Sequence, residues 1–194
     1  NGTNNIVIGG GSDGGATQDY QITIGSQFNN DGDDNSIQFV NGALSRRLSY
    51  DLDSGNATIT SDERTKEDIT DYQIGLEFIN KLKPKQFTKK KNADLPDEFF
   101  GEYTASRNDT TKNPRVYQGM IAQEVSASMV EMGITPTHIT GSAASNPHFS
   151  GWEQSKESGE QRLSYVSFVV PLIKAVQELS AEVTNLKAQV SGSN

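Results

Sequence analysis

The chain has 194 residues, a net charge of −8 and no cysteine, and only 33% of its residues are apolar. Without cysteine it can form no disulfide, thiol nucleophile or zinc–thiolate site, and its acidic balance disfavours phosphate contacts, so we expect no nucleic-acid partner. No apolar run approaches the roughly 20 residues that cross a bilayer, so we expect no membrane insertion. The low apolar fraction argues against one large core within a single chain.

The composition changes sharply near residue 60. Residues 1–60 carry 10 of the 18 glycines, no Lys, Glu or Pro, and 2 Arg against 7 Asp. Residues 61–194 carry all of the Lys, Glu and Pro in the chain. A shift of this size indicates a boundary, so we expect two domains, 1–60 and 61–194.

Residues 1–60 contain a short repeat in which apolar residues alternate with others. Asn5–Gly9 is echoed by Gln21–Gly25 and more weakly by Ser36–Val40, at offsets of 16 and 15 residues. Such alternation is typical of strands, and turn-forming residues separate the copies. One short strand cannot bury its own face, so the units should stack or pair with other chains. We interpret the segment as the end of an intertwined trimeric β-stalk, with a flexible Gly/Asn linker as the alternative.

A helix and then a strand are expected after residue 60. Thr70–Gln73 has the spacing of a capping box and predicts a helix start. Four apolar residues then fall on one helical face before Pro84 ends the helix, namely Ile74, Phe78, Ile79 and Leu82. Lys85–Lys89, centred on Phe87, predicts a strand.

Two long polar segments flank the next structured element. Val116–Met132 predicts a strand that turns into a helix, with Met120, Ile121, Val125 and Met129 as its apolar members. Residues 91–115 predict a loop or an extended hairpin. Residues 133–160 are rich in Gly, Ser and Pro and predict a long ordered excursion. Loops of this length are usually either functional or disordered.

The clearest element is a C-terminal helix over residues 171–190. Its apolar residues are spaced alternately by four and three: Leu172, Val176, Leu179, Val183, Leu186 and Val190. This spacing, with Glu182 at g and Lys187 at the next e, predicts a parallel coiled coil. Val at a with Leu at d leans toward dimers, but a three-chain stalk would override that weak preference. The alternative is a lone amphipathic helix packed on its own domain.

Most of the polar clusters in the sequence do not indicate a catalytic or metal-binding site. His138 and His148 lack the spacing of a metal-binding pair, and the Lys89–Lys91 run is typical of a solvated loop. The aspartates of an Asp-Gly-Asp-Asp stretch, Asp31, Asp33 and Asp34, lack the glutamate that closes an EF-hand loop. We therefore expect no metal site and no cofactor.

The remaining chemical candidate is Thr60–Lys66, which lies across the composition boundary. A Ser and a Lys can serve as nucleophile and base without His, provided that the Lys is neutral. A nearby positive charge favours the neutral form, and Arg64 is a candidate for that charge. The alternative is a pair of loose helix-capping patterns that begin at Thr60 and Thr65.

The same segment carries a family resemblance. Ser61–Ile69 resembles the opening of the intramolecular chaperone domain of the endosialidase type, also called the S74 peptidase family. Tyr117–Val125 resembles the family's G-x-I-A-Q-E-V segment, and Leu163–Tyr165 with Val170–Leu179 resembles its C-terminal helix. Phe78–Phe87 fits its helix-then-strand pattern. Domains of this family end phage tail fibres, tail spikes and neck appendages.

The resemblance implies a domain that trimerises, helps the preceding stalk to fold and then cuts the chain just before the motif serine. It implies Ser61 as the nucleophile, Lys66 as the general base and Thr60–Ser61 as the scissile bond. Four further residues match motif positions without an assigned role: Asp62, Arg64, Gln123 and Glu124. The segments 91–115 and 133–160 would correspond to arms that hold the stalk.

The expected protein is therefore α+β, with a trimeric stalk resembling a triple β-helix, followed by an α+β chaperone domain that ends in a coiled-coil helix. Its partners would be two further copies of the chain and its own stalk, which is both folding client and substrate. The resemblance implies a virion protein whose precursor folds and is cut in the host cytoplasm. The alternative is a structural trimerisation cap of a fibre or adhesin that never cleaves.

Overall fold

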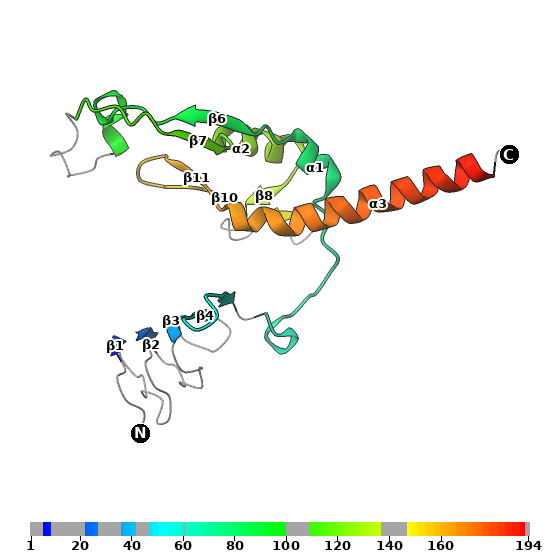
Figure 1. The fold of residues 1–194 in the computed structure, drawn as a ribbon, viewed down its shortest axis with the longest axis horizontal. Helices are drawn as coiled ribbons and strands as arrows, with labels where there is room; N and C mark the ends of the chain where they lie inside the picture. The colour runs from blue at the N-terminus through cyan, green and yellow to red at the C-terminus, as the bar shows by residue number, and fades with distance from the viewer. Residues whose placement is uncertain are drawn as a thin grey trace, which may run out of the picture. The chain divides into compact units, whose positions relative to one another are not determined.

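The computed structural model describes residues 6–8, 22–26, 36–41, 47–59, 61–99, 109–136 and 147–192. The described chain is α+β and separates into two compact units, Asn1–Thr70 and Asp71–Asn194 (Figure 1). Three of the positions discussed above, Thr60, His138 and the Asp31–Asp34 stretch, lie outside the described residues.

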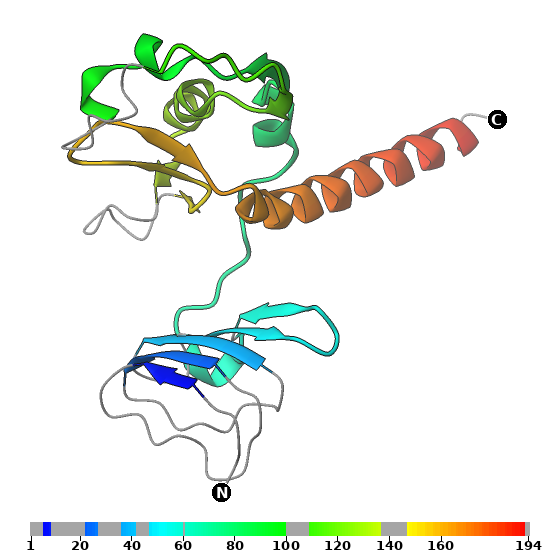
Figure 2. The same cartoon turned by 60° about the vertical axis from the view of Figure 1, so that its left-hand side comes forward.

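The first unit contains a five-stranded sheet in the order β1-β2-β3-β4-β5. β1 (Ile6–Ile8), β2 (Ile22–Ser26) and β3 (Ser36–Asn41) are parallel. β4 (Arg47–Asp51) and β5 (Ala57–Ile59) continue the sheet in antiparallel fashion (Figure 2).

The register of the parallel strands confirms the alignment of the sequence repeats. Ile6 pairs with Ile22, and Ile22 pairs with Ile37. These are the positions that the offsets of 16 and 15 residues bring together. Because side chains alternate across a strand, this register collects the apolar residues on one face of the sheet.

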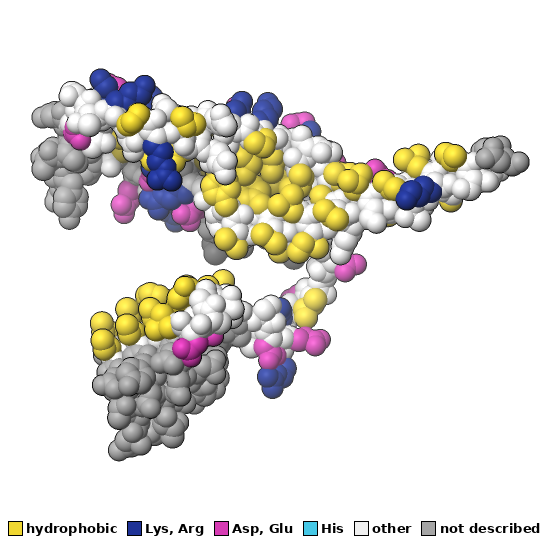
Figure 3. Space-filling model, in the orientation of Figure 1, with side chains coloured by type: hydrophobic (Ala, Val, Ile, Leu, Met, Phe, Trp, Pro, Cys, Tyr) yellow, Lys and Arg dark blue, Asp and Glu magenta, His cyan; other side chains and the backbone are white. Residues whose placement is uncertain are grey.

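The apolar face of the sheet is open in the single chain (Figure 3). Its large exposed side chains are Ile6, Ile8, Ile24, Phe39, Leu48, Tyr50 and Ile59. The opposite face buries two polar residues, Ser36 and Gln38, and Gln38 Nε2 donates to Ser36 Oγ at 3.1 Å. Exposed apolar patches mark interaction surfaces, so this face is suited to contact with a partner.

The hairpin of β4 and β5 has no counterpart among the sequence-based predictions. Its turn places Gly55 at a φ of 72°, and the Asp51 carboxylate accepts hydrogen bonds from Asp53 N and Ser54 Oγ at 2.8 and 2.6 Å. The bond from Ser54 is the largest cause of the lowered pKa of Asp51. Alternating apolar residues around an Asp-Ser-Gly turn are a hairpin signal that identifies these strands.

The second unit is built around α1 (Leu76–Lys81), α2 (Ala122–Glu131) and α3 (Val169–Ser191). Its buried core consists of Ile74, Phe78, Val125, Met129, Ile134, Phe149, Trp152 and Phe168. The Phe149 ring meets Phe78 and Phe168 edge-on, with centroid distances of 5.2 and 4.8 Å. The apolar faces predicted within residues 74–82 and 116–132 therefore supply much of this core.

The predicted start of the first helix at Thr70 is wrong, because α1 begins at Leu76. Gly75 occupies the N-cap position and provides no side-chain hydrogen bond. The cap comes from α3 instead, where Glu178 Oε2 accepts a hydrogen bond from Leu76 N at 2.7 Å. A side chain at Gly75 would overlap the Glu178 carboxylate, so the start of the helix depends on a tertiary contact that local sequence does not encode.

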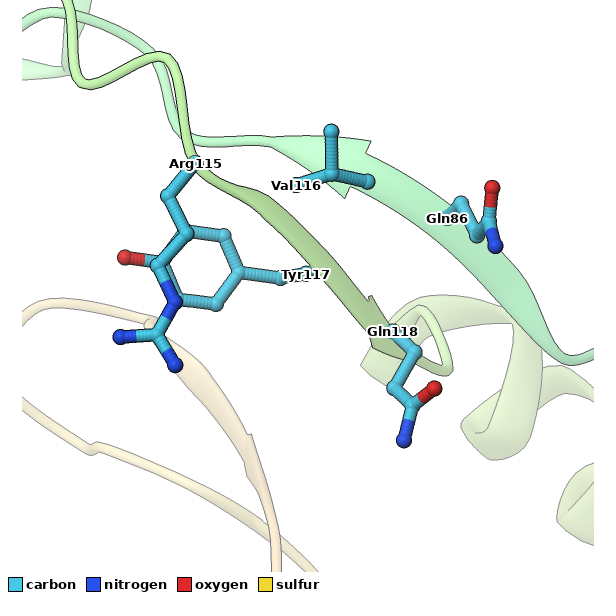
Figure 4. Close-up of a pocket in the computed structure, with 5 residues that line it drawn as sticks. All are labelled: Gln86, Arg115, Val116, Tyr117 and Gln118. Carbon is cyan, nitrogen blue, oxygen red and sulfur yellow. The ribbon is translucent and has the colours of Figure 1, made fainter.

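Residues 91–115 connect two paired strands, and residues 100–108 of this segment lie outside the described part of the chain. β6 (Lys85–Thr88) is antiparallel to β7 (Val116–Gly119). Beyond them lie two 3-10 turns, η2 (Asn92–Asp94) and η3 (Asp97–Phe99). At the base of this hairpin the Arg115 guanidinium lies over the Tyr117 ring, 5.2 Å from its centroid (Figure 4).

The second polar segment, residues 133–160, lies partly within the core rather than forming an arm throughout. β8 (Thr135–Pro136) pairs in parallel with β9 (His148–Phe149). β10 (Trp152–Gln154) pairs antiparallel with β11 (Gln161–Leu163). Because Phe149 is 1% exposed and Trp152 8% exposed, residues 147–154 belong to the body of the second unit.

α3 uses different faces at its start and along its length. Pro171, in the first turn of the helix, and Ala175 are buried, and the short 3-10 turn η4 (Tyr165–Phe168) precedes them. The heptad residues, by contrast, are all exposed: Leu172, Val176, Leu179, Val183, Leu186 and Val190. All residues from 179 to 192 are exposed, and this half of α3 extends beyond the body of the second unit (Figure 1). The helix therefore packs on its own unit and still leaves the heptad stripe uncovered.

Candidate functional site

A short 3-10 turn, η1 (Glu63–Thr65), lies within the first unit and carries the chemical candidates. Asp62 occupies its N-cap position, and Asp62 Oδ1 accepts a hydrogen bond from Arg64 N at 2.9 Å. Thr65 Oγ1 donates to the Asp62 carbonyl oxygen at 2.7 Å, and Lys66 N donates to the Glu63 carbonyl oxygen at 2.9 Å. Asp is among the residues that best accept N–H groups at such a cap.

The turn brings Ser61 and Lys66 into contact. Lys66 Nζ donates to Ser61 Oγ at 2.9 Å and lies 3.1 Å from the Ser61 carbonyl oxygen. Fully extended, five residues would separate these positions by about 17 Å, so the contact depends on the turn between them. Both side chains are exposed in the single chain. The structure thus brings together the two residues proposed as nucleophile and base.

Arg64 pairs with Asp62 rather than with the lysine. Its Nε and Nη2 donate to the two oxygens of the Asp62 carboxylate at 2.9 and 2.6 Å. These bonds are the largest cause both of the lowered pKa of Asp62 and of the raised pKa of Arg64. In this arrangement the guanidinium is engaged with Asp62, so the suggestion that Arg64 lends its charge to Lys66 gains no support.

The backbone bends just after the lysine. Asp68 has a φ of 51°, and no other non-glycine residue among those described has a positive φ. The left-handed region is unfavourable for most residues and better tolerated by Asp and Asn. Residues 61–70 group with the strands of the first unit, so the Ser61–Lys66 contact and the bend belong to the strand-bearing unit.

Gln123 and Glu124 lie in the other unit, in the first turn of α2. Gln123 is exposed, whereas Glu124 Oε1 lies 3.5 Å from Lys85 Nζ and its Oε2 is buried without a hydrogen-bond partner among the described residues. A glutamate at the start of a helix is favoured by the helix dipole. Both residues therefore belong to the start of α2, in the unit that does not contain Ser61 and Lys66.

Gly119, in the Tyr117–Val125 motif, leaves room for a hydrogen bond between two motifs, a role that the sequence did not reveal. Met120 N donates to the Tyr165 hydroxyl at 2.9 Å, and a side chain at Gly119 would overlap that hydroxyl. The Leu163–Tyr165 and Tyr117–Val125 motifs are thus joined by one hydrogen bond. The sequence spacing gives no sign of this contact, because Met120 and Tyr165 are 45 positions apart.

The other titratable candidates supply no second site among the described residues. The His148 carbonyl oxygen accepts a hydrogen bond from the Tyr72 hydroxyl at 3.4 Å, and burial raises the pKa of Tyr72 to about 12. Within the described ranges, no three His, Cys, Asp or Glu side chains gather as a metal site would require. No described helix is long and apolar enough to cross a membrane.

Comparison with known protein families identifies the segment. Residues 61–134 match the model of the Peptidase_S74 family, described as the chaperone of endosialidase. The match starts at Ser61 and runs through the turn, α1, the paired strands β6 and β7, and α2. Residues 61–134 are therefore similar to this family, in agreement with the resemblance read from the sequence, and the match supports a role as an intramolecular chaperone. Neither the curated proteins nor the solved structures include a match.

Proposed function

We propose that the chain forms a homotrimer, helps its own N-terminal β-strands to fold as a trimeric stalk, and then releases that stalk by cutting itself between Thr60 and Ser61. The observation that carries the proposal is the 2.9 Å contact between Lys66 Nζ and Ser61 Oγ, at the point where the family match begins. The protein would be the precursor of a phage tail fibre or spike, folded and cut in the host cytoplasm and retained in the virion.

Trimerisation is supported by two apolar surfaces that the single chain leaves open. One is the heptad stripe of α3, whose six residues are exposed. The other is the apolar face of the five-stranded sheet. Burying apolar area stabilises an assembly by about 25 cal/mol per Å², and parallel α3 helices would also pair Glu182 of one copy with Lys187 of the next.

A helper domain answers a specific difficulty in folding the stalk. Strands of three to six residues gain little until several chains are in register, and the entropic cost of closing loops comes before the contacts that compensate it. Joining three chain ends at a C-terminal trimer raises the local concentration of the strands to roughly the millimolar range. It also sets their register, which otherwise slips easily in polar, Gly-rich strands.

The chemistry of release would be an acyl transfer. Neutral Lys66 takes the proton from Ser61 Oγ, and the oxygen attacks the carbonyl carbon of Thr60. The bond from that carbon to Ser61 N breaks, the amine takes up the proton, and an ester to Ser61 Oγ forms. Water then hydrolyses the ester, leaving a carboxylate on Thr60 and a free amine on Ser61. Backbone N–H groups would stabilise the oxyanion, and no cofactor is required.

The exposure of the pair suggests how cleavage is timed. A base must be neutral, and burial favours the neutral form of a lysine side chain. Ser61 and Lys66 are exposed in the single chain, so burial would have to come from folding and assembly of the trimer. We therefore propose that the dyad becomes active only after the stalk has folded, which prevents premature release.

Intact mass measurement under denaturing conditions tests the chemistry. Wild type should give two fragments, 1–60 and 61–194, whereas Ser61→Ala and Lys66→Ala should stay whole. Lys66→Arg should also stay whole, because an arginine keeps its charge and cannot act as a base. Glu63→Gln, which alters an exposed side chain in the same turn, is the matched control and should be cut normally. Equal cleavage in all variants would refute the dyad, and an uncut wild-type trimer would instead support a structural cap.

A further inference from the structure

The turn that brings Ser61 and Lys66 together has no hydrophobic support of its own. None of the residues of η1 is buried. Exposed 3-10 turns are weak, since their hydrogen-bond geometry is poor and their first N–H groups lack partners within the turn. Local hydrogen bonds must therefore decide how often the turn is formed in the exposed state.

Asp62 supplies most of those local bonds. Its Oδ1 accepts the N–H of Arg64 at 2.9 Å, and its carbonyl oxygen accepts from Thr65 N and Thr65 Oγ1 at 3.1 and 2.7 Å. Its carboxylate makes no hydrogen bond to Ser61 or Lys66. The Asp62 carboxylate therefore hydrogen-bonds within the turn and not to the reacting groups, while its charge also acts on Lys66.

We propose that Asp62 is a positioning residue for self-cleavage, whose carboxylate caps η1 and so holds Lys66 Nζ beside Ser61 Oγ. This inference rests on the proposed function, because it concerns the same dyad. Without the cap, Arg64 N loses its partner and the turn opens more often. When the turn is open, the four residues between Ser61 and Lys66 no longer hold the two side chains within hydrogen-bonding distance.

The cap function can be separated from the charge of the aspartate. Asparagine keeps an oxygen that accepts the Arg64 N–H and caps about as well as aspartate, whereas alanine has no acceptor. The ion pair with Arg64 would be lost in both variants. A role in the cap therefore predicts that asparagine rescues cleavage, and a role through charge predicts that it does not.

The rate of appearance of the cut fragments distinguishes these roles. Asp62→Ala should slow cleavage by about fivefold, and Asp62→Asn should remain within about twofold of wild type. Glu67→Ala removes an exposed carboxylate from the same motif and is the matched control, with an unchanged rate. The pH at which the rate is half-maximal should be the same in Asp62→Ala and Asp62→Asn, because both variants lose the carboxylate charge that acts on Lys66. Light scattering checks that each variant assembles as wild type does.

Three results would overturn the inference: equal rates for Asp62→Ala and wild type, equally slow rates for Asp62→Asn and Asp62→Ala, or different pH profiles for these two variants. A second readout keeps the test independent of cleavage. The second readout uses the uncut Ser61→Ala protein labelled with ¹⁵N at its six arginines. The hydrogen of the Arg64 amide should exchange with solvent faster after Asp62→Ala, and about as slowly as with the native Asp62 after Asp62→Asn. If wild type is not cut, the proposed self-cleavage is refuted but the capping role of Asp62 is not. If the exchange rate of the Arg64 amide is the same in all of these variants, the capping role of Asp62 is refuted.

Discussion

At the scale of single residues, one carboxylate determines where a helix begins. Glu178 Oε2 accepts the N–H of Leu76 at 2.7 Å, while its Oε1 lies 3.4 Å from Lys174 Nζ. The hydrogen bond from Leu76 is the largest cause of the lowered pKa of Glu178. Gly75 is required beside it, because any side chain there would overlap the carboxylate. The start of α1 is therefore fixed by α3, far along the chain.

This cap gives the second unit a defined dependence on pH. The pKa of Glu178 is lower in the folded state than its ordinary value of 4.5, so its contribution to stability is fully present above that value. The contribution is lost as the pH falls through the folded-state pKa. We expect Glu178→Ala to lower the thermal midpoint of unfolding, measured by circular dichroism at neutral pH. Glu178→Gln should lower the midpoint less, because the amide oxygen can still accept the hydrogen bond from Leu76 N.

The control for this prediction is Gln177→Ala, which removes an exposed neighbour on the same helix. On acidification below 4.5, the difference between wild type and Glu178→Ala should shrink, because the protonated carboxyl is a weaker acceptor. A thermal midpoint for Glu178→Ala equal to that of wild type at neutral pH would show that the cap contributes nothing.

At the scale of elements, the second half of α3 is a helix without a partner. Its residues from 179 to 192 are all exposed in the single chain. Isolated helices shorter than about 12–15 residues are marginal in water, so an uncovered half-helix of this kind gains most of its stability from packing. Its apolar side chains lie at heptad positions, which favours packing against copies of itself.

We therefore predict that Leu186→Asp converts the proposed trimer to monomers, because three carboxylates would meet in one layer of the proposed coiled coil. Leu186 is 59% exposed in the single chain, so the change should leave the fold of each unit intact. Asn185→Asp adds the same charge at the next residue, on the outside of the coil, and should remain trimeric. Light scattering compares the two variants, and equal masses would contradict the role assigned to the stripe.

The sequence revealed those elements whose signal is local. The repeat offsets, the C-terminal helix and the strand-to-helix change within residues 116–132 all depend on periodicity, and the structure places them accordingly. The contact of Ser61 with Lys66 spans only five residues, so spacing was enough to nominate it. In each case the residues that matter are neighbours in sequence or repeat at a fixed period.

The predictions that failed depended on contacts between distant residues. A capping box at Thr70–Gln73 predicted the wrong helix start, because a glutamate 102 positions from Leu76 supplies the cap. Phe149 and Trp152 lie in a Gly/Ser/Pro-rich segment that we interpreted as a long excursion, and that the family resemblance implied to be an arm, yet both are buried in the core. The burial of Phe149 follows from packing against Phe78 and Phe168, and no local pattern encodes it.

At the scale of the whole molecule, the low apolar fraction of the chain has a structural explanation. The strand-bearing unit directs its apolar residues to an open face and buries polar ones on the other. A core completed by other copies needs fewer apolar residues from each chain. On the proposed account, the helper domain builds that shared core once, and the cut then leaves a stalk that persists because it unfolds slowly.

Refolding before and after the cut tests this account most directly. Wild type, which the proposal expects to be cut, and the uncut Ser61→Ala variant are unfolded in denaturant and returned to native buffer, and the recovered trimer is measured by light scattering. We predict that Ser61→Ala recovers its trimer whereas the separated 1–60 fragments of wild type do not, because their chain ends are no longer held together. Equal recovery of the stalk from both proteins would contradict the chaperone role.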